Sequence, residues 1–537
     1  MTVVEFEQEE FLSLVGTRLS MEEVEAKVSM MGAAPEGIQG TLQRFDINPN
    51  RPDWLSIEGI ARSFRGVLGL EEGLPKYEVV DGPIVFRVDP SVRDVRPFAA
   101  GGVVRNVEFT ESLLASLINL QENLHLTHGR RRRKVAIGIH DLDKVRPPFT
   151  YKAVPPTSVR FVPLGRAESM DLQEILDRHE KGIEYGGALA GKSTYPVIDD
   201  AEGHVLSFPP IVNGIATQLS PETRNLFVDV TGTDEEAVAI ALNIVSTALA
   251  ERGATIESVE LRTAEGMRRS PDLSPRGYTL DVAVSNALLG LDLSGEQIAA
   301  CLRRMRYDAE AQGERILVKA PRYRSDILHK FDLVEDVAIG YGYDNIPKML
   351  PRHHTAGHAT RLAEFTDALR MLMVGHGYHE IMSLTVAPPA EPWESPPRVT
   401  LLNPVSVEQS KMRSSLLPSM MGILALNKHR DLPQRVFEIG DAVRGGVNVR
   451  LLSAASIHAK AGFTEMKSLV QGLFRDVGKT LEIEPLEDPN FIDGRCAAVR
   501  AAEASVGLFG EVHPRVVTGY GLSHPVIVLE LDVIPLE

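Results

Sequence analysis

An acidic segment around residue 330 constrains the local fold more than any other feature of the sequence. Asp332, Glu335 and Asp336 stand at positions i, i+3 and i+4, so a helix that begins near Asp332 carries these three carboxylates on one side. Asp326 lies six residues earlier, in the segment that leads into this helix. Carboxylates at this spacing repel one another, and a bound cation relieves the repulsion. Helix capping explains the same pattern, because Asp332 and Glu335 have the spacing of a capping box, and spacing alone favours capping over a metal site.

The length of the chain requires several domains, because 537 residues are too many for one hydrophobic core. Hydrophobic residues make up 43% of the sequence and charged residues 24%, which is typical of globular domains. The changes in periodicity and the positions of prolines predict an α+β multidomain protein. Its four expected units are residues 1–90, 98–265, 266–350 and 352–537.

The clearest helical patterns lie in the first two units. Residues 53–68 have an apolar stripe at helical spacing, with Asp53 as the candidate N-cap. Residues 234–252 form a second helical pattern, for which Thr233 and Glu236 supply a capping box. The second unit also contains strand-like runs, at residues 134–140 and 209–215.

The third and fourth units also mix helices and strands. In the third unit Ser294 and Gln297 cap a helix, two short strands turn near Gly313, and the acidic helix follows. Helices around a small hairpin suggest a winged-helix relative, which concerns the fold and is no indication of DNA binding. In the fourth unit we expect a helix at residues 418–428 and a strand at residues 435–443.

Charge and cysteine content exclude several classes of protein. The net charge of −16 argues against a surface broadly coated for nucleic acid, so any nucleic-acid contact should be local or supplied by a partner. No apolar run is long enough to span a membrane, and the acidic start does not resemble a signal peptide. Cys301 and Cys496 lie far apart and fit no zinc pattern, so we expect a reduced, cytoplasmic protein without a membrane partner.

One basic run interrupts the acidic background. Residues 129–134 have the sequence Gly-Arg-Arg-Arg-Arg-Lys and follow a leucine-rich helical pattern directly. These five cations could contact phosphate groups, or they could close the C-terminus of a helix and remain solvated. No aromatic residues are interleaved with the charges, which favours the solvated alternative. The sequence contains no phosphate-binding loop, nucleophile elbow or zinc-protease motif, so no complete active site follows from motifs alone.

Several segments share their sequence and order with one known family. Residues 46–62 have the sequence Asp-Ile-Asn-Pro-Asn-Arg-Pro-Asp-Trp-Leu-Ser-Ile-Glu-Gly-Ile-Ala-Arg, and residues 323–347 begin with Tyr-Arg-Ser-Asp and end with Gly-Tyr-Gly-Tyr-Asp-Asn-Ile-Pro. Shorter motifs follow at residues 403–404, 412–418 and 436–440. Together these segments resemble the beta subunit of phenylalanyl-tRNA synthetase over essentially the whole chain. The length resembles that of the archaeal and eukaryotic form.

This resemblance implies a division of labour between two subunits. The alpha subunit would join phenylalanine to tRNA(Phe) through an adenylate, at the expense of ATP. This chain would complete an (αβ)2 heterotetramer and contribute ligands for Mg2+ at the subunit boundary. By position, the magnesium ligands are Asp326, Asp332, Glu335 and Asp336. The last of these is a glutamate in many relatives. The resemblance thus reverses the preference for capping, although Asp332 can still begin the helix.

The resemblance also implies an editing domain in the second unit, which hydrolyses tRNA(Phe) mischarged with tyrosine. Ser207, Asp229 and Thr231 match pocket residues of the archaeal type. A pocket that accepts tyrosine and rejects phenylalanine must hydrogen-bond the phenolic hydroxyl, and a carboxylate and hydroxyls are suitable partners. Without the resemblance, Asp229 would be a strand-end residue and Thr231 would merely precede a helix cap.

The fourth unit resembles a class II synthetase fold, built on an antiparallel sheet, that has lost its chemistry. Phe437 and Glu438 stand where the second class motif has an arginine-bearing strand, and residues 507–514 lack the arginine of the third motif. ATP would lose a principal phosphate partner there, so we expect a pseudo-catalytic scaffold. Two alternatives remain for the whole chain: a structural RNA-binding module without editing activity, and a stand-alone hydrolase of mischarged tRNA.

Overall fold

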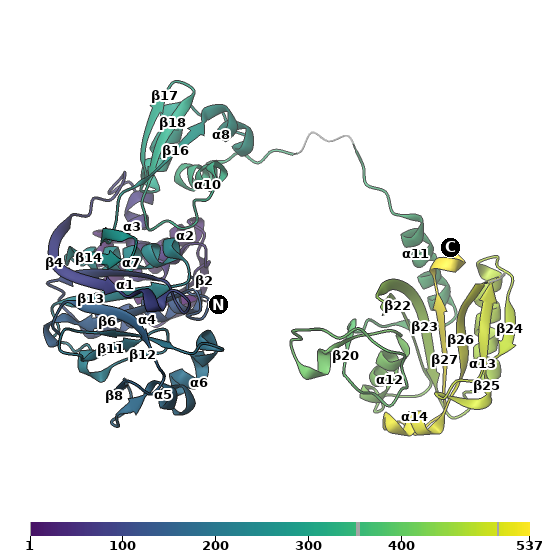
Figure 1. The fold of residues 1–537 in the computed structure, drawn as a ribbon. Helices are drawn as coiled ribbons and strands as arrows, with labels where there is room; N and C mark the ends of the chain where they lie inside the picture. Colours follow the sequence, from purple (N-terminus) through teal and green to yellow (C-terminus); the bar gives the residue numbers. More distant parts are fainter. Residues whose placement is uncertain (1, 351–354, 502–503) are drawn as a thin grey trace. The chain divides into compact units, whose positions relative to one another are not determined.

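The protein divides into two compact units, residues 1–350 and residues 351–537 (Figure 1). A computed structural model describes residues 2–350, 355–501 and 504–537. The first three predicted units pack together in the first compact unit, and the fourth predicted unit forms the second. Among the residues described, no helix has the length and apolar character needed to span a bilayer.

The first compact unit begins with a small sheet covered by helices. Its strands are ordered β1-β3-β2, and its elements are β1 (Val3–Glu7), α1 (Gln8–Val15), α2 (Met21–Met30), β2 (Ala34–Gln39), β3 (Leu42–Asp46) and α3 (Ile57–Val67). Helix α3 begins later than the predicted Asp53, because Ser56 is its N-cap and accepts the backbone N–H of Gly59. Asp53 lies in the preceding short turn η1 (Pro52–Trp54), where it pairs with Arg51.

A ten-stranded sheet follows, in the order β12-β11-β10-β7-β4-β14-β5-β13-β6, with β15 paired to β14. Two long helices, α4 (Glu111–Leu126) and α7 (Glu235–Ala250), pack with the inner strands in one hydrophobic core. The strands are β4 (Val79–Val88), β5 (Phe98–Arg105), β6 (Val135–Asp141), β7 (Phe149–Val154), β10 (Tyr195–Asp199), β11 (Val205–Phe208), β12 (Val212–Asn213), β13 (Leu226–Gly232), β14 (Thr255–Thr263) and β15 (Gly266–Ser270).

Three expectations for this region need correction. The sheet already includes β4, so it extends across the predicted boundary between residues 90 and 98. Helix α7 is capped by Asp234, whose side chain accepts the backbone N–H of Ala237, and not by Thr233. Only Val212–Asn213 of the predicted strand at 209–215 is a strand, because the residues before it form a turn.

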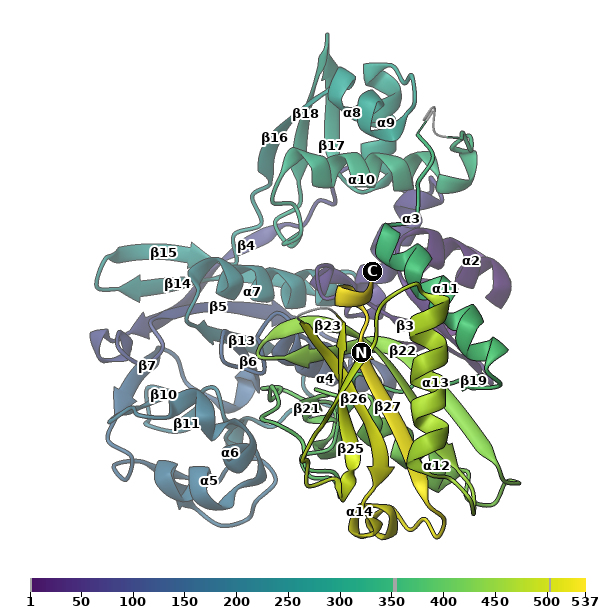
Figure 2. The same ribbon diagram turned by 90° about the vertical axis from the view of Figure 1, so that its right-hand side faces the viewer.

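The remainder of the first compact unit packs helices against a three-stranded antiparallel sheet ordered β16-β18-β17. The capping box of Ser294 and Gln297 and the strand turn near Gly313 are confirmed. The elements are β16 (Arg276–Asp281), α8 (Val282–Leu289), α9 (Gly295–Arg304), β17 (Asp308–Gln312), β18 (Arg315–Ala320) and α10 (Lys330–Tyr341). Figure 2 shows α10 lying across these strands near one end of the sheet.

The acidic helix α10 is capped differently from the prediction. Its N-cap is His329, and Asp332 occupies the third position, where its carboxylate accepts the backbone N–H of His329 at 2.7 Å. The expected capping box between Asp332 and Glu335 is therefore wrong, because the helix begins before Asp332. Asp332 still caps the helix, as the partner of His329 and not of Glu335.

The second compact unit is built on a seven-stranded sheet ordered β19-β22-β23-β27-β26-β25-β24. All pairs are antiparallel except β19 with β22, which agrees with the antiparallel sheet expected from the resemblance. The expected helix and strand are confirmed as α12 (Leu417–Leu426) and β22 (Gln434–Arg444). The other main elements are α11 (Arg361–Gly375), β19 (His379–Glu380), β23 (Val447–Ile457), α13 (Phe463–Asp476), β24 (Glu482–Pro485), β25 (Phe491–Ala501), β26 (Ala504–Val512), α14 (Pro514–Gly519) and β27 (Val526–Asp532).

Candidate functional site

The two faces of β13 differ in chemistry. Leu226, Val228 and Val230 pack into the core that contains α4 and α7. The alternate residues Asp229 and Thr231 face the other side, because side chains alternate along a strand. Asp229 is 1% exposed and Thr231 is fully buried, so both polar groups need partners inside the protein. Asp229 lies in the middle of the strand and not at its end.

Asp229 is held by a histidine on the neighbouring strand β6. Nε2 of His140 lies 2.6 Å from Oδ2 of Asp229, and Nδ1 of His140 lies 2.8 Å from the hydroxyl of Thr217. The residue opposite Asp229 on β6 is Gly138. A Cβ atom at residue 138 would lie 2.0 Å from Oδ2 of Asp229, so only glycine leaves room for this carboxylate.

Thr231 is held by a buried arginine. Nε of Arg96 donates to the Thr231 hydroxyl at 3.0 Å, and the other end of the guanidinium donates to the Thr231 carbonyl at 2.7 Å. Burial lowers the pKa of Arg96 to about 10, so it remains a cation at neutral pH. The Thr231 hydroxyl also has a side-chain hydrogen bond with the buried phenol of Tyr151, so Thr231 is held from two sides.

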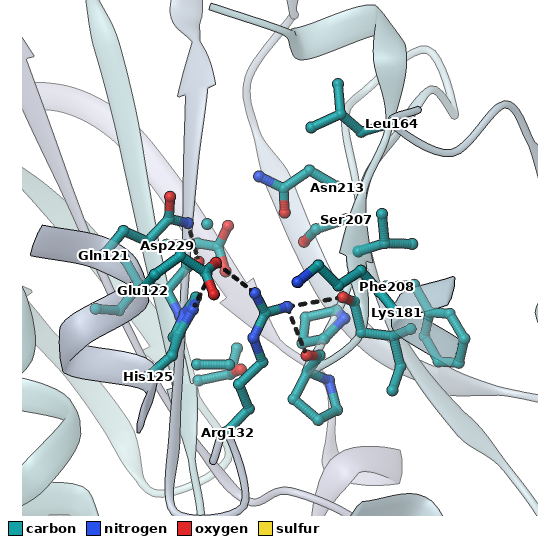
Figure 3. Close-up of a pocket in the computed structure, with 18 of the residues that line it drawn as sticks. Gln121, Glu122, His125, Arg132, Leu164, Lys181, Ser207, Phe208, Asn213 and Asp229 are labelled. Atoms are coloured by element: carbon teal, nitrogen blue, oxygen red, sulfur yellow. Dashed lines mark hydrogen bonds and ion pairs between the residues drawn. The ribbon is translucent and has the colours of Figure 1, made fainter. Parts of the chain in front are cut away.

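Asp229, Thr231 and Ser207 line one cavity of about 390 Å³, which we call the β13 cavity (Figure 3). Ser207 comes from β11, which lies near the opposite edge of the same sheet from β13. Its hydroxyl is buried and has no hydrogen-bond partner among the residues described. Three residues chosen from the sequence therefore meet at one cavity, whose volume suits a small ligand.

The other wall of the β13 cavity comes from the end of α4 and the turn after it. Arg132 crosses this wall, donating to the carbonyl of Ile211 at 2.9 Å and to Oε1 of Glu122 at 2.6 Å (Figure 3). Its guanidinium also lies over the ring of Tyr185, 4.4 Å from the ring centroid. Arg132 is only 7% exposed, so it is a fixed part of the cavity wall.

Two titratable groups beside Arg132 have shifted pKa values. Burial lowers the pKa of His125 to about 4, although Glu122 favours its cation. Nε2 of His125 accepts the backbone N–H of Ile137 at 2.9 Å, which places the ring hydrogen on Nδ1. Burial opposes the charge on Glu122, but His125 and Arg132 together lower its pKa to about 2. At neutral pH this wall therefore holds a neutral histidine, an anionic glutamate and a cationic arginine.

Arg324 binds two of the four carboxylates assigned to magnesium. Its guanidinium meets both oxygens of Asp326, at 2.8 and 2.6 Å, and lies 2.7 Å from Oδ2 of Asp336. The hydroxyl of Tyr307 donates to the same oxygen of Asp336. Although burial opposes the charge, Arg324 lowers the pKa of Asp326. A guanidinium thus neutralises the two carboxylates within the chain itself.

The other two carboxylates lie apart from this pair. Oδ2 of Asp332 accepts two backbone N–H groups, of Leu328 at 2.8 Å and His329 at 2.7 Å. Glu335 is exposed. Within the described ranges, no three of the predicted ligands bring their oxygens within 4.8 Å of one another. The chain alone therefore does not assemble a closed cation site from these residues.

Two family models match the chain. The model of the phenylalanyl tRNA synthetase beta chain CLM domain matches residues 346–533, and the model of the tRNA synthetase B5 domain matches residues 278–343. A protein of Methanothrix thermoacetophila, named phenylalanine–tRNA ligase beta subunit, is 44% identical over an alignment of 542 positions that covers 99% of each chain. The chain belongs to the phenylalanine–tRNA ligase beta-subunit family.

Other members of the phenylalanine–tRNA ligase beta-subunit family match to the same extent. The protein of that name from Archaeoglobus fulgidus is 41% identical over 542 residues, covering 99% of this chain and 98% of the relative. A crystal structure of an N-terminal fragment of the phenylalanyl-tRNA synthetase beta subunit from Pyrococcus horikoshii is 40% identical, with a TM-score of 0.61. It covers 63% of this chain and 99% of the fragment. The family resemblance indicated by the sequence motifs is thereby confirmed.

Several residues around the β13 cavity were not predicted from the sequence. Along α4 the leucines mark the core side, and Gln121, Glu122 and His125 form a polar group beside them at i, i+1 and i+4. This spacing can be read from the sequence, but it does not indicate that the three polar side chains line a cavity. His140 gave no signal either, because its partner lies 89 positions away in the sequence. Arg132 was expected to be solvated and is instead buried.

Proposed function

We propose that this chain acts as the non-aminoacylating beta subunit of a phenylalanine–tRNA ligase, and that the β13 cavity hydrolyses tyrosyl-tRNA(Phe). The observation that carries the proposal is the meeting of a buried carboxylate, Asp229, with an unpartnered buried hydroxyl, Ser207, in one cavity. Buried polar groups without partners are costly unless a ligand supplies the missing hydrogen bond. Family membership makes a mischarged tRNA the natural source of that ligand.

The polar end of the cavity distinguishes tyrosine from phenylalanine. Oδ2 of Asp229 is engaged by His140, which leaves Oδ1 to accept the phenolic hydrogen. The unpartnered hydroxyl of Ser207 can donate to the phenolic oxygen, and Thr231 lines the same cavity. Phenylalanine brings no hydroxyl and would leave these groups unpaired, which can reduce reactivity by about 10⁴-fold. Hydrolysis would therefore remove tyrosine and spare the cognate product.

The opposite wall supplies charges for ester hydrolysis. Water adds to the ester carbonyl and the bond to the ribose oxygen breaks. One proton of the water goes to the ribose oxygen, so the tRNA regains its hydroxyl, and the other is released to solvent as tyrosine leaves as a carboxylate. Arg132 offers a fixed cation for the oxygen that becomes negative, and its Nε–H has no hydrogen-bond partner among the described residues. Glu122 stays anionic and can hold the α-ammonium group or orient the water.

The second compact unit is proposed to be a pseudo-catalytic scaffold for a partner. Glu438 on β22 is buried and lies 2.8 Å from Arg413, which is buried as well. The hydroxyl of Ser383 also donates to Glu438, at 2.6 Å. Arg413 thus neutralises the carboxylate of Glu438 within the chain, and neither side chain is left to bind a nucleotide. We expect the catalytic alpha subunit to be the partner, in a cytoplasmic (αβ)2 assembly that binds tRNA(Phe).

Magnesium binding remains part of the proposal in a restricted form. Asp326 and Asp336 are already satisfied by Arg324, whereas Glu335 is exposed and Asp332 uses only one oxygen for capping. The four residues do not fit a self-contained Mg2+ site, so the partner subunit would have to complete one. No step of the hydrolysis depends on that ion. Comparing Mg2+ binding by the chain with Mg2+ binding by the αβ complex, both with and without Glu335→Gln, tests this part.

The experiment that tests the function compares the purified chain with the complex of matched subunits. We expect both to hydrolyse tyrosyl-tRNA(Phe), and only the complex to catalyse phenylalanine-dependent ATP–pyrophosphate exchange. Exchange by the isolated chain would contradict the division of labour. Binding of tRNA without any hydrolysis would favour a structural RNA-binding module, and full aminoacylation by an alpha subunit without this chain would favour a stand-alone hydrolase.

A further inference from the structure

Residues 130–133 form a left-handed turn, which we call the arginine turn. Arg130, Arg131 and Arg132 have φ angles of +48°, +54° and +62°. A residue with a side chain is disfavoured by roughly 1–2 kcal/mol in this region relative to the right-handed conformation. Glycine would occupy these positions without that cost, so the chain retains arginine at three consecutive positions against its backbone preference.

The arginine turn is fixed at both ends. The N–H of Arg132 donates to the carbonyl of His125 at 3.0 Å, and the N–H of Lys134 donates to the carbonyl of Gly129 at 2.8 Å. In its middle, Arg132 is anchored in the wall of the β13 cavity by Glu122 and a backbone carbonyl. The turn therefore directs one arginine inward and leaves its neighbours, Arg130, Arg131 and Arg133, exposed.

These three exposed guanidinium groups lack counter-ions. Their side chains make no ion pair or hydrogen bond within the described part of the chain, whereas Lys134 pairs with Asp234 at 3.2 Å and Arg132 pairs with Glu122. The chain carries a net charge of −16, so acidic groups are plentiful elsewhere. Three unpaired cations within four residues, on both sides of the arginine that lines the cavity, form a surface without neutralising negative charge.

We propose that Arg130, Arg131 and Arg133 bind the phosphates of the tRNA 3′ strand and thereby hold the aminoacyl end in the β13 cavity. This inference rests on the proposed hydrolytic function of that cavity. An aminoacyl ester inside the cavity is joined to a phosphodiester chain that must remain outside it. Arg131 and Arg133 are covalent neighbours of Arg132, which lines the cavity, and Arg130 is next to Arg131, so the three exposed cations flank one residue of the cavity wall. Guanidinium groups bind phosphate oxygens with two parallel hydrogen bonds, which suits this role.

The same arrangement explains why the left-handed turn is retained. A flexible loop would have to become ordered when the tRNA binds, and the loss of conformational entropy would weaken binding. A turn fixed by Arg132 presents the backbone of its three exposed arginines already in place, so only their side chains have to become ordered. The net negative charge of the chain confines this attraction to one surface, so the cavity, and not the whole protein, attracts the strand.

The test uses the αβ complex with the triple variant Arg130→Gln/Arg131→Gln/Arg133→Gln. One substrate is tyrosyl-tRNA(Phe), and the other is tyrosyl-adenosine, which has the ester but no phosphates. We expect kcat/KM for the tRNA to fall by about 10- to 100-fold, mostly through KM, with hydrolysis of tyrosyl-adenosine unchanged. The slope of log kcat/KM against log salt concentration should become shallower by about 2, the value for three phosphate contacts to a single strand.

Two further variants keep the interpretation unambiguous. The charge-matched control Arg18→Gln/Lys27→Gln/Arg87→Gln removes three exposed cations from other elements, and it should leave the salt slope unchanged. The triple arginine-to-lysine variant keeps the charge of the turn and should restore most of the slope. An unchanged salt slope in the glutamine variant would overturn the proposal, and so would an equal loss on both substrates. Failure of the wild-type complex on both substrates would instead refute the hydrolytic function of the cavity.

Discussion

His140 lies 2.6 Å from Asp229 through Nε2 and Oδ2, and both side chains are at least 98% buried. This contact explains how a carboxylate can persist on the central part of a large sheet, because the imidazole supplies the hydrogen bond that water would otherwise provide. It also fixes which oxygen of Asp229 remains available to a ligand. Asp229 is thus positioned by the fold before any substrate arrives.

Gly138 is required for this contact. Gly138→Ala would place a methyl group 2.0 Å from Oδ2 of Asp229, so the carboxylate or the strand must move. We expect a loss of about 1–3 kcal/mol in the free energy of unfolding and a strong fall in deacylation of tyrosyl-tRNA(Phe). Gly187→Ala is the matched control, since a Cβ atom there meets no atom within 4 Å. Denaturant unfolding and deacylation are measured for both variants and the wild type. A Gly138→Ala variant as stable as the wild type, with wild-type deacylation, would contradict the prediction.

His125 makes the stability of the cavity depend on pH. Its pKa is about 4 in the folded protein, below the ordinary histidine value of 6.5 that holds in the unfolded chain, so the unfolded chain binds the proton more readily. Stability from this group is fully present above pH 6.5 and is lost as the pH falls from 6.5 towards 4, by about 3 kcal/mol in total. Unfolding of the wild type and of His125→Asn over this range measures the effect. The variant should lose this part of the pH dependence, and identical profiles would contradict the assignment.

Arg62 connects the two long sequence motifs of the family. Its guanidinium lies 3.7 Å from the ring centroid of Tyr323 and donates to the hydroxyl of Tyr77 at 3.1 Å. A double-mutant cycle with Arg62→Met and Tyr323→Leu should give a coupling free energy of about 1–2 kcal/mol. Denaturant unfolding measures it. A coupling near zero would mean that the two motifs do not stabilise each other.

Arg324 should be needed for stability even without metal. Arg324→Gln removes the guanidinium between the buried Asp336 and the largely buried Asp326, so we expect a loss of about 3–5 kcal/mol. The control Lys330→Gln breaks a half-exposed pair with Asp281 and should cost less than about 1 kcal/mol. Unfolding in EDTA compared with unfolding in Mg2+ completes the experiment. If EDTA destabilises the wild type as much as the substitution does, a metal ion and not Arg324 neutralises these carboxylates.

The sequence predicted local features better than long-range contacts. The Ser294 capping box and the strand turn at Gly313 depend on neighbouring residues, and both are confirmed. Asp229 and Thr231 were found only through the family resemblance, because their partners His140 and Arg96 lie 89 and 135 positions away. No periodicity within one segment contains that information.

The acidic helix shows the same limit at closer range. Its existence was predicted correctly, but its first residue was not, because histidine is an uncommon N-cap and Asp332 looked like the better candidate. Arg324 was within the same motif, yet spacing alone could not show that its side chain lies between Asp326 and Asp336. Arg132 was wrongly predicted to be solvated. Its inward direction depends on a left-handed turn at three arginines, which ordinary backbone preference does not predict.

The central claim is that the β13 cavity hydrolyses tyrosyl-tRNA(Phe) through Asp229, and one comparison tests it most directly. Deacylation and phenylalanine aminoacylation are measured in the αβ complex with wild-type chain, with Asp229→Ala, and with Asp81→Ala as an exposed control on β4. We expect Asp229→Ala to lower kcat/KM for deacylation by about 100-fold or more and to leave aminoacylation within about twofold of wild type. Unchanged deacylation, or an equal loss of both activities, would contradict it.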